Sequence, residues 1–223
     1  MEDTDSAARQ SLGQLILAPA LISLAVTIFR LAGELAHWSQ KYFNTAVGGG
    51  VSIVGITWLA PIFGAFFAAR LVRAGVGPRS AWRAMVFAAL GAAVLVGGSS
   101  LGGALPFVSG FYARLLYIWI VFALAGVVIF PGWPALFKLQ LAYAYAARIP
   151  VVLVMFLAFQ QGWVTHYSAA PRDTPPGIAL WPKFLWLGFF PQLTFWVGFT
   201  LVSGMLSGGI VAVLARLFKR PAR

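Results

Sequence analysis

The stretch AMVFAALGAAVLVGGSSLGGAL, residues 84–105, contains no charged side chain and consists largely of Ala, Val, Leu and Gly. It exceeds the length of about 20 apolar residues that an α-helix needs to cross the hydrocarbon core of a bilayer. Four other stretches are likewise free of charge, at residues 12–29, 115–130, 149–159 and 193–215. This repeated pattern predicts several membrane-spanning helices.

The overall composition agrees with this interpretation. Of the 223 residues, 61% are hydrophobic and 9% are charged, whereas soluble domains have about 25% charged residues. A soluble protein of this size needs far more polar surface to cover its core, but lipid can cover apolar helices. The sequence therefore indicates an integral membrane protein.

We predict an all-α, polytopic membrane helix bundle with about six transmembrane helices and one or two interfacial amphipathic helices. The predicted spans are 12–36, 51–71, 84–105, 114–130, 149–164 and 193–217. They form a single membrane domain between two cytoplasmic tails, residues 1–11 and 218–223. Because Pro150 interrupts an apolar run, we expect residues 135–147 to form an interfacial helix. The alternative is one kinked span over residues 136–160.

The distribution of basic residues predicts the orientation. The chain has 16 Lys and Arg against 5 Asp and Glu, a net charge of +11. With the N-terminus inside, most basic residues fall on the inner side, as the positive-inside rule requires. The inner-side residues are Arg9, Arg70, Arg73, Arg79, Arg83, Lys138, Arg148, Arg216, Lys219, Arg220 and Arg223, and the outer-side residues are Arg30, Lys41, Arg114, Arg172 and Lys183. We predict a multi-pass protein of the bacterial inner membrane with both termini cytoplasmic.

Composition also narrows the set of partners. The basic residues lie between apolar runs and form no stripe with interleaved aromatic residues, which argues against nucleic-acid binding. The absence of cysteine excludes disulfides, iron–sulfur clusters and thiolate metal sites within this chain. We expect membrane lipids as partners, together with copies of the same chain or other membrane subunits, since 223 residues is small for a lone transporter.

A charged group ends the first span, in the sequence RLAGELAHWSQKYFN (30–44). Arg30, Glu34 and His37 are four and three residues apart, so they share one helix face. The simplest interpretation is an Arg30–Glu34 ion pair with His37 at the interface, because charges at membrane depth are usually paired. The alternative is a functional cluster that includes His166, which is predicted on the same side. Two histidines and Glu34 resemble a metal-ligand set, and two histidines alone are able to bind haem iron.

Small residues predict close helix packing. They occur at Gly98 and Gly102 in the third span, and at Ser203, Gly204, Ser207 and Gly208 in the last. Small side chains allow helix backbones to approach closely in lipid, within one chain or between chains.

Other polar residues lie in or near the apolar runs. Arg148, just before Pro150, is interpreted as an interfacial anchor, with contact to an anionic lipid or substrate as the alternative. Gln160, Gln161 and Gln192 either line a pathway or form hydrogen bonds across helices.

No catalytic residue is assigned. Apart from Glu34 no acid lies within a predicted span, and no nucleotide-binding motif occurs. The sequence favours a non-enzymatic membrane protein without a cofactor, either a small transporter or channel-like unit or an accessory subunit of a membrane complex. The alternative is a membrane metalloprotein or haem-binding redox subunit, with haem or a divalent metal held by His37 and His166.

Overall fold

The computed structural model describes residues 2–50 and 52–218, with side chains from Gly13 onward. Helices, turns and loops make up this part of the chain, and no strand occurs among its residues. Within it, six helices are long and apolar enough to cross a membrane: Gly13–Leu35, Ile56–Arg73, Ala81–Ala104, Phe111–Gly132, Pro134–Gln161 and Leu180–Leu217. The predicted fold class, an all-α polytopic helix bundle, is confirmed. Residues 219–223 of the predicted C-terminal tail lie outside the described residues, as does Val51 at the predicted start of the second span.

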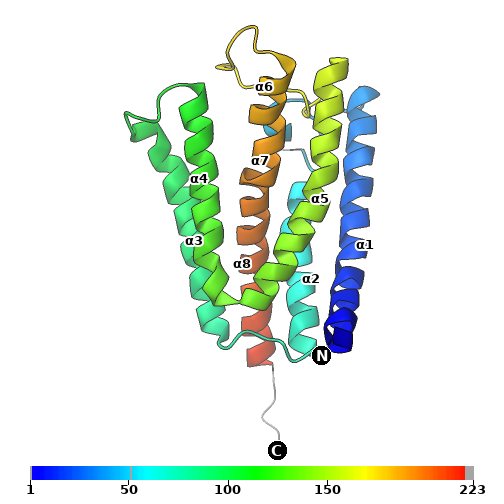
Figure 1. Ribbon diagram of the computed structural model, residues 1–223, viewed down its shortest axis with the longest axis vertical. Helices are drawn as coiled ribbons and strands as arrows, with labels where there is room; N and C mark the ends of the chain where they lie inside the picture. Colours follow the sequence, from blue (N-terminus) through cyan, green and yellow to red (C-terminus); the bar gives the residue numbers. More distant parts are fainter. Residues whose placement is uncertain (1, 51, 219–223) are drawn as a thin grey trace, which may run out of the picture.

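The helices stand side by side, with the ends of the chain on one side of the bundle (Figure 1). Their bounds are α1 Glu2–Leu35, α2 Leu59–Arg73, α3 Ala81–Leu101, α4 Phe111–Ile129, α5 Pro134–Gln161, α6 Leu180–Phe184, α7 Phe190–Leu193 and α8 Phe195–Leu217. A π-helical turn, Leu185–Phe189, joins α6 to α7. We call the side where α1 begins and α8 ends the terminal end. The opposite side, the loop end, carries the α1–α2 loop (residues 36–50 and 52–55) and the α5–α6 loop (residues 162–179).

One of the predicted helices is wrong. Residues 135–147 do not form a separate interfacial helix, because α5 runs unbroken from Pro134 to Gln161 with Pro150 inside it. Proline removes one backbone donor, but membrane helices tolerate this where neighbouring helices compensate. The alternative of a single span over 136–160 is therefore the better description. In addition, α1 begins at Glu2, so residues 2–11 are helical and continue into the first span.

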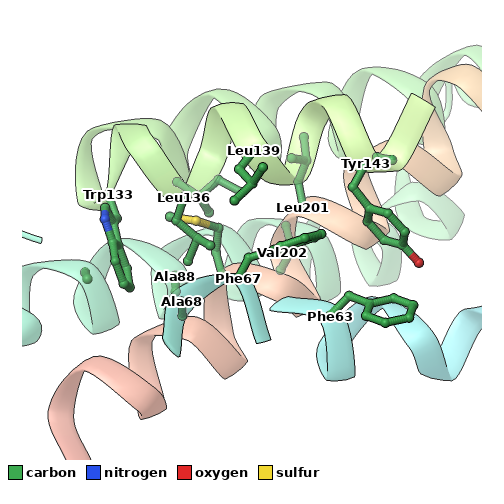
Figure 2. Packing of buried hydrophobic residues seen from close by; sticks show 14 of the residues in the cluster. Phe63, Phe67, Ala68, Ala88, Trp133, Leu136, Leu139, Tyr143, Leu201 and Val202 are labelled. Atoms are coloured by element: carbon green, nitrogen blue, oxygen red, sulfur yellow. The ribbon is translucent and has the colours of Figure 1, made fainter. Parts of the chain in front are cut away.

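The main hydrophobic core fills the terminal half of the bundle. It joins aromatic side chains of α2 to apolar side chains of α5 and α8, among them Phe63, Phe67, Leu136, Leu139, Tyr143 and Val202 (Figure 2). Tyr143 packs edge-on against both Phe63 and Phe67. Its hydroxyl group lies 2.8 Å from Ser23 Oγ of α1. This hydrogen bond satisfies the one polar atom of a side chain that is otherwise in apolar surroundings.

Glycines allow α2, α5 and α8 to pack at very short distances. A Cβ atom on Gly64 of α2 would lie 2.4 Å from the Cα atom of Gly204 in α8. A Cβ atom on Gly208 would lie 2.3 Å from Cδ2 of Leu136 in α5. Neither position has room for a larger residue, so these glycines set the separation of the three helices.

The small residues of α3 serve its contact with α4. A Cβ atom on Gly98 would lie 2.7 Å from Cγ1 of Val121, and one on Gly102 would lie 2.8 Å from Cε1 of Tyr117. The Tyr117 hydroxyl donates to the Gly98 carbonyl at 2.7 Å. These two glycines therefore pack within the chain.

The serines of α8 bond to their own helix. Ser203 Oγ donates to the Phe199 carbonyl at 2.7 Å, and Ser207 Oγ donates to the Gly204 carbonyl at 3.0 Å. Each hydroxyl is thereby satisfied without a partner from another helix, as is usual for serine in membrane helices.

We expect Gly64→Ala to destabilise the protein, because its Cβ would meet backbone atoms of α8 that cannot move independently. The cost should be about 1–3 kcal/mol, as for other overpacked sites. Gly97→Ala is the matched control, since a Cβ there has no atom within 4 Å. Thermal unfolding in detergent, followed by tryptophan fluorescence, measures both. Equal melting temperatures for the two variants would contradict the proposed close contact.

Candidate functional site

An ion pair lies buried near the loop end of α1. Arg30 Nε donates to Glu34 Oε1 at 2.7 Å, and the Glu34 side chain is completely buried. The two residues are one helical turn apart, so α1 itself places them in contact. Each charge therefore neutralises the other at a depth where an unpaired charge is costly.

Arg30 also holds the α1–α2 loop. Its Nη1 donates to the Val54 carbonyl at 2.8 Å, and its Nη2 donates to the carbonyls of Asn44 and Gly49 at 3.0 and 3.1 Å. A Cβ atom on Gly49 would lie 2.5 Å from Nη2, and one on Gly55 would lie 2.8 Å from Nη1. Gly49 also has a φ of +80°, which favours glycine. The glycines of this loop allow its backbone to wrap around the guanidinium.

Glu34 binds the α5–α6 loop as well. It accepts from the backbone N–H of His166 through Oε2 at 2.8 Å, and its Oε1 lies 2.6 Å from the ring Nδ1. Burial lowers the pKa of the His166 imidazole from its ordinary value, and the hydrogen bond to Glu34 opposes this only in part. The ring is therefore neutral at pH 7, and its Nδ1–H donates to Glu34. The adjacent Tyr167 donates its hydroxyl to the Thr27 carbonyl of α1 at 3.2 Å.

The structure thus brings three of the four predicted cluster residues together: Arg30, Glu34 and His166. His37 is exposed, just beyond the end of α1, and has a positive φ of 53°. Among the described residues, no group of three or more His, Asp or Glu side chains is placed to hold a metal ion. Metal or haem binding by His37 and His166, with or without Glu34, stays a prediction.

A cavity of about 390 Å³ lies beside this cluster, in the half of the bundle toward the loop end. Its volume is within the range of roughly 300–1,000 Å³ that is usual for small-molecule sites. The walls come from α1, α4, α5, the last span and both loops, and most of the lining side chains are apolar. The polar side chains in the lining are Thr27, Arg30, Thr57, Arg148, His166, Tyr167 and Gln192.

Arg148 lies halfway along α5 and is only 4% exposed. It is therefore not the interfacial anchor expected from the sequence. Its Nη1 donates to Gln192 Oε1 at a long 3.4 Å, and its Cζ lies 4.8 Å from the centre of the Trp196 ring. No described carboxylate pairs with it: Glu34 binds Arg30 and His166, and Asp173 binds Arg114. Arg148 is a buried charge without a counter-charge among the described side chains.

The guanidinium groups of Arg30 and Arg148 differ sharply in the number of hydrogen bonds that they make. A guanidinium has five N–H donors. Arg30 makes four hydrogen bonds, one of them within its ion pair with Glu34, whereas Arg148 makes the single long bond to Gln192. Contact with an aromatic face stabilises a desolvated cation by roughly 2 kcal/mol, while arginine at the centre of a membrane helix costs about 2.5–3.5 kcal/mol or more. Trp196 therefore offsets only part of the cost of burying Arg148.

Further donors surround the cavity. The indole Nε1 of Trp119, a lining residue, is buried and has no hydrogen-bond partner. The 3₁₀ turn Ile56–Trp58, which leads into α2, begins at the cavity wall, and no side chain caps its start. The first N–H groups of a helix lack intrahelical acceptors and favour negative charge. The region of the cavity thus contains unpaired donors, while the hydroxyl and amide oxygens of its lining residues Thr27, Thr57, Tyr167 and Gln192 are its acceptors.

The sequence contained one overlooked signal for this site. Arg148 stands in the middle of the apolar run from 134 to 161, where no acidic residue is available to pair with it. The predicted helix boundary at Pro150 placed Arg148 near the end of a span, and Arg148 was therefore expected at the membrane interface. The contact of Trp196 with Arg148, by contrast, joins residues on different helices and has no local sequence signal.

Comparison with protein-family models, with curated proteins and with solved structures gives no match.

We expect Arg30 and Glu34 to be energetically coupled. Glu34→Gln or Arg30→Gln alone leaves the other charge buried and unpaired, which should cost about 3–5 kcal/mol. The double variant should cost less than the sum of the singles, by roughly 0.5–3 kcal/mol. It should still be less stable than the wild type, since Arg30 also holds three loop carbonyls. Thermal unfolding of all four proteins in one detergent tests this, and additive losses would refute the coupling.

Acidification should destabilise the protein through His166. Its pKa is lowered in the folded protein, so the unfolded protein binds a proton at higher pH, near the ordinary histidine value of about 6.5. The stability that the neutral ring contributes is present above that pH and is lost as the pH falls below it. We expect the wild-type melting temperature to fall from pH 7.5 to pH 5, and His166→Gln to reduce this fall. The exposed His37 supplies the control, His37→Gln, which should behave as the wild type. Parallel curves for all three proteins would count against a buried neutral His166.

Proposed function

We propose that this polytopic membrane protein is a transporter of a small molecule and that the cavity is its substrate site. The observation that carries the proposal is Arg148, a buried and incompletely satisfied charge in the wall of a cavity within the bundle. Charged residues in membrane spans are costly and usually mark a substrate or ion pathway. A purely structural arginine would be expected to have a carboxylate partner, as Arg30 does.

Interrupted helices at the cavity support transport over a passive structural role. The second span, Ile56–Arg73, does not begin as a regular α-helix, because its first residues form the 3₁₀ turn Ile56–Trp58. Thr57 of this turn and Gly55 in the non-helical backbone just before it line the cavity. Non-helical backbone at membrane depth is tolerated where it is buried in protein or lines a polar cavity. Many transporters form their substrate sites from such discontinuous helices.

The last span is also irregular where it meets the cavity. The π-helical turn Leu185–Phe189 and the following Pro191 contribute lining residues. Single π-helical turns inside membrane helices are frequent at functional sites. Two different spans therefore lose regular helical geometry on the wall of the same cavity.

Access to the cavity is one-sided in this conformation. The dense core around Phe67, Leu136 and Tyr143 closes the terminal end, while both loops contribute to the wall near the loop end. We propose that the loop end faces outward, because basic residues gather where α2 and α8 end and where α3 and α5 begin, at the terminal end. These residues are Arg70, Arg73, Arg79, Arg83, Lys138 and Arg216. On this proposal the protein belongs to a bacterial inner membrane, with both termini in the cytoplasm.

Single-cysteine labelling tests this proposal. Because the chain has no cysteine, an introduced cysteine is the only thiol of this protein that the reagent can modify. Ile118 and Ile120 lie two residues apart on α4, but Ile118 lines the cavity whereas Ile120 is 49% exposed on the outer surface of the bundle. A membrane-impermeant thiol reagent added outside intact cells should modify Ile118→Cys faster than Ile120→Cys, which lipid should protect. Equal rates, or reaction of Ile118→Cys only from inside, would contradict the proposed site or its orientation.

Transport itself requires a second measurement. Native mass spectrometry of the protein in mild detergent should reveal a bound organic molecule at fixed stoichiometry. A labelled form of that molecule should cross proteoliposomes containing the protein, and modification of Ile118→Cys should block the flux. A bound molecule that does not cross would favour an accessory subunit, and a haem or metal ion in its place would favour the redox alternative.

A further inference from the structure

We propose that the cavity takes a singly charged organic anion, such as a monocarboxylate, whose acid group pairs with Arg148 and whose apolar body packs against α4 and α5. This rests on the proposed function, which requires a small-molecule site but does not specify its charge. The inference follows from the balance of charge around the cavity, the surroundings of Arg148 and the chemistry of the walls.

The charge balance leaves one positive charge to be matched. Arg30, Arg148 and His166 are the described basic side chains that line the cavity. Glu34 neutralises Arg30 at 2.7 Å, and His166 is neutral because burial disfavours its charged form. Arg148 alone remains, so a ligand with one negative charge would make the site neutral. A cation would meet an uncompensated arginine, and a dianion would bring a second charge with no partner.

The surroundings of Arg148 leave it free to bind an acid group. Trp196 covers one face of the guanidinium, and the hydrogen bond to Gln192 is long. Aromatic stacking leaves the N–H groups at the edge of an arginine available, and this edge matches a carboxylate with two parallel hydrogen bonds.

The walls set the character of the rest of the ligand. Apolar side chains from four helices line the cavity, among them Val26, Leu115, Ile118, Val151, Met155 and Phe195. Such walls favour an aliphatic or aromatic body and offer no partner to a second ionised group. Their low polarity also strengthens the pairing of an acid group with Arg148.

Three naphthalene derivatives that share one ring system but differ in charge test whether the cavity requires a single negative charge. The protein is placed in nanodiscs of phosphatidylcholine, and binding of tritiated 2-naphthoate is measured with 2-naphthamide and naphthalene-2,6-dicarboxylate as competitors. We expect saturable binding of 2-naphthoate and binding at least about 30-fold weaker for the neutral amide, the usual effect of removing one partner from a buried charge pair. The dicarboxylate should also bind more weakly. Octanoate serves as an aliphatic second probe.

Substitutions of Arg148 test its role. Arg148→Met should abolish binding of 2-naphthoate and at the same time raise the melting temperature of the ligand-free protein, because it removes an uncompensated buried charge. Arg148→Lys should retain weaker binding, since it keeps the charge without the bidentate edge. Arg114→Met is the matched control, because Arg114 is exposed at the start of α4 and pairs with Asp173 away from the cavity lining.

Several results would overturn the inference. These are competition by 2-naphthamide equal to that of 2-naphthoate, unchanged binding in Arg148→Met, and no Arg148-dependent binding of either 2-naphthoate or octanoate. Loss of 2-naphthoate binding in nanodiscs that contain phosphatidylglycerol would assign the site to an anionic lipid instead. Ile118→Cys labelling separates these failures from failure of the proposed function, because it reports an accessible cavity whatever the charge of the ligand.

Discussion

The buried guanidinium of Arg30 organises the loop end of this protein. In hydrocarbon each N–H group needs an acceptor and each charge needs a counter-charge. Glu34 supplies the counter-charge, and the α1–α2 loop supplies carbonyls from Asn44, Gly49 and Val54. Glu34 then accepts from His166 and so fixes the α5–α6 loop. Two loops far apart in the chain are positioned because one arginine must be satisfied away from water.

The same constraint explains why Arg148 indicates function. It lies further from the ends of its helix than Arg30 does, and among the described residues it has neither a carboxylate nor a set of carbonyls around it. Burial of this unpaired charge lowers the stability of the folded protein. Proteins commonly accept such a loss of stability where the residue binds a ligand. The fold supplies a rigid core at the terminal end, and the cavity with its incompletely satisfied charge lies above that core.

Sequence alone was sufficient for the features that depend on local composition. Charge-free runs predicted a bundle of about six spans, although the fifth and sixth begin earlier than predicted, and the four-residue spacing of Arg30 and Glu34 placed them in contact on one helix. Contacts between distant segments were not accessible in this way. Glu34 meets the backbone N–H of His166, 132 residues further along the chain, and the sequence pattern suggested only a shared side of the membrane. Pro150 was misleading, since packing in the bundle overrides its local tendency to end a helix.

The π-helical turn at Leu185–Phe189 makes the exact number of residues in the last span important. A π-helical turn holds one residue more than an α-helical turn, so deletion of a single residue there would restore a regular helix. Every position after the deletion would then rotate by about 100° relative to the preceding residues. Gln192 and Trp196 would turn away from Arg148, or else the glycines of α8 would turn away from α2. This span should therefore tolerate substitutions more readily than insertions or deletions of single residues.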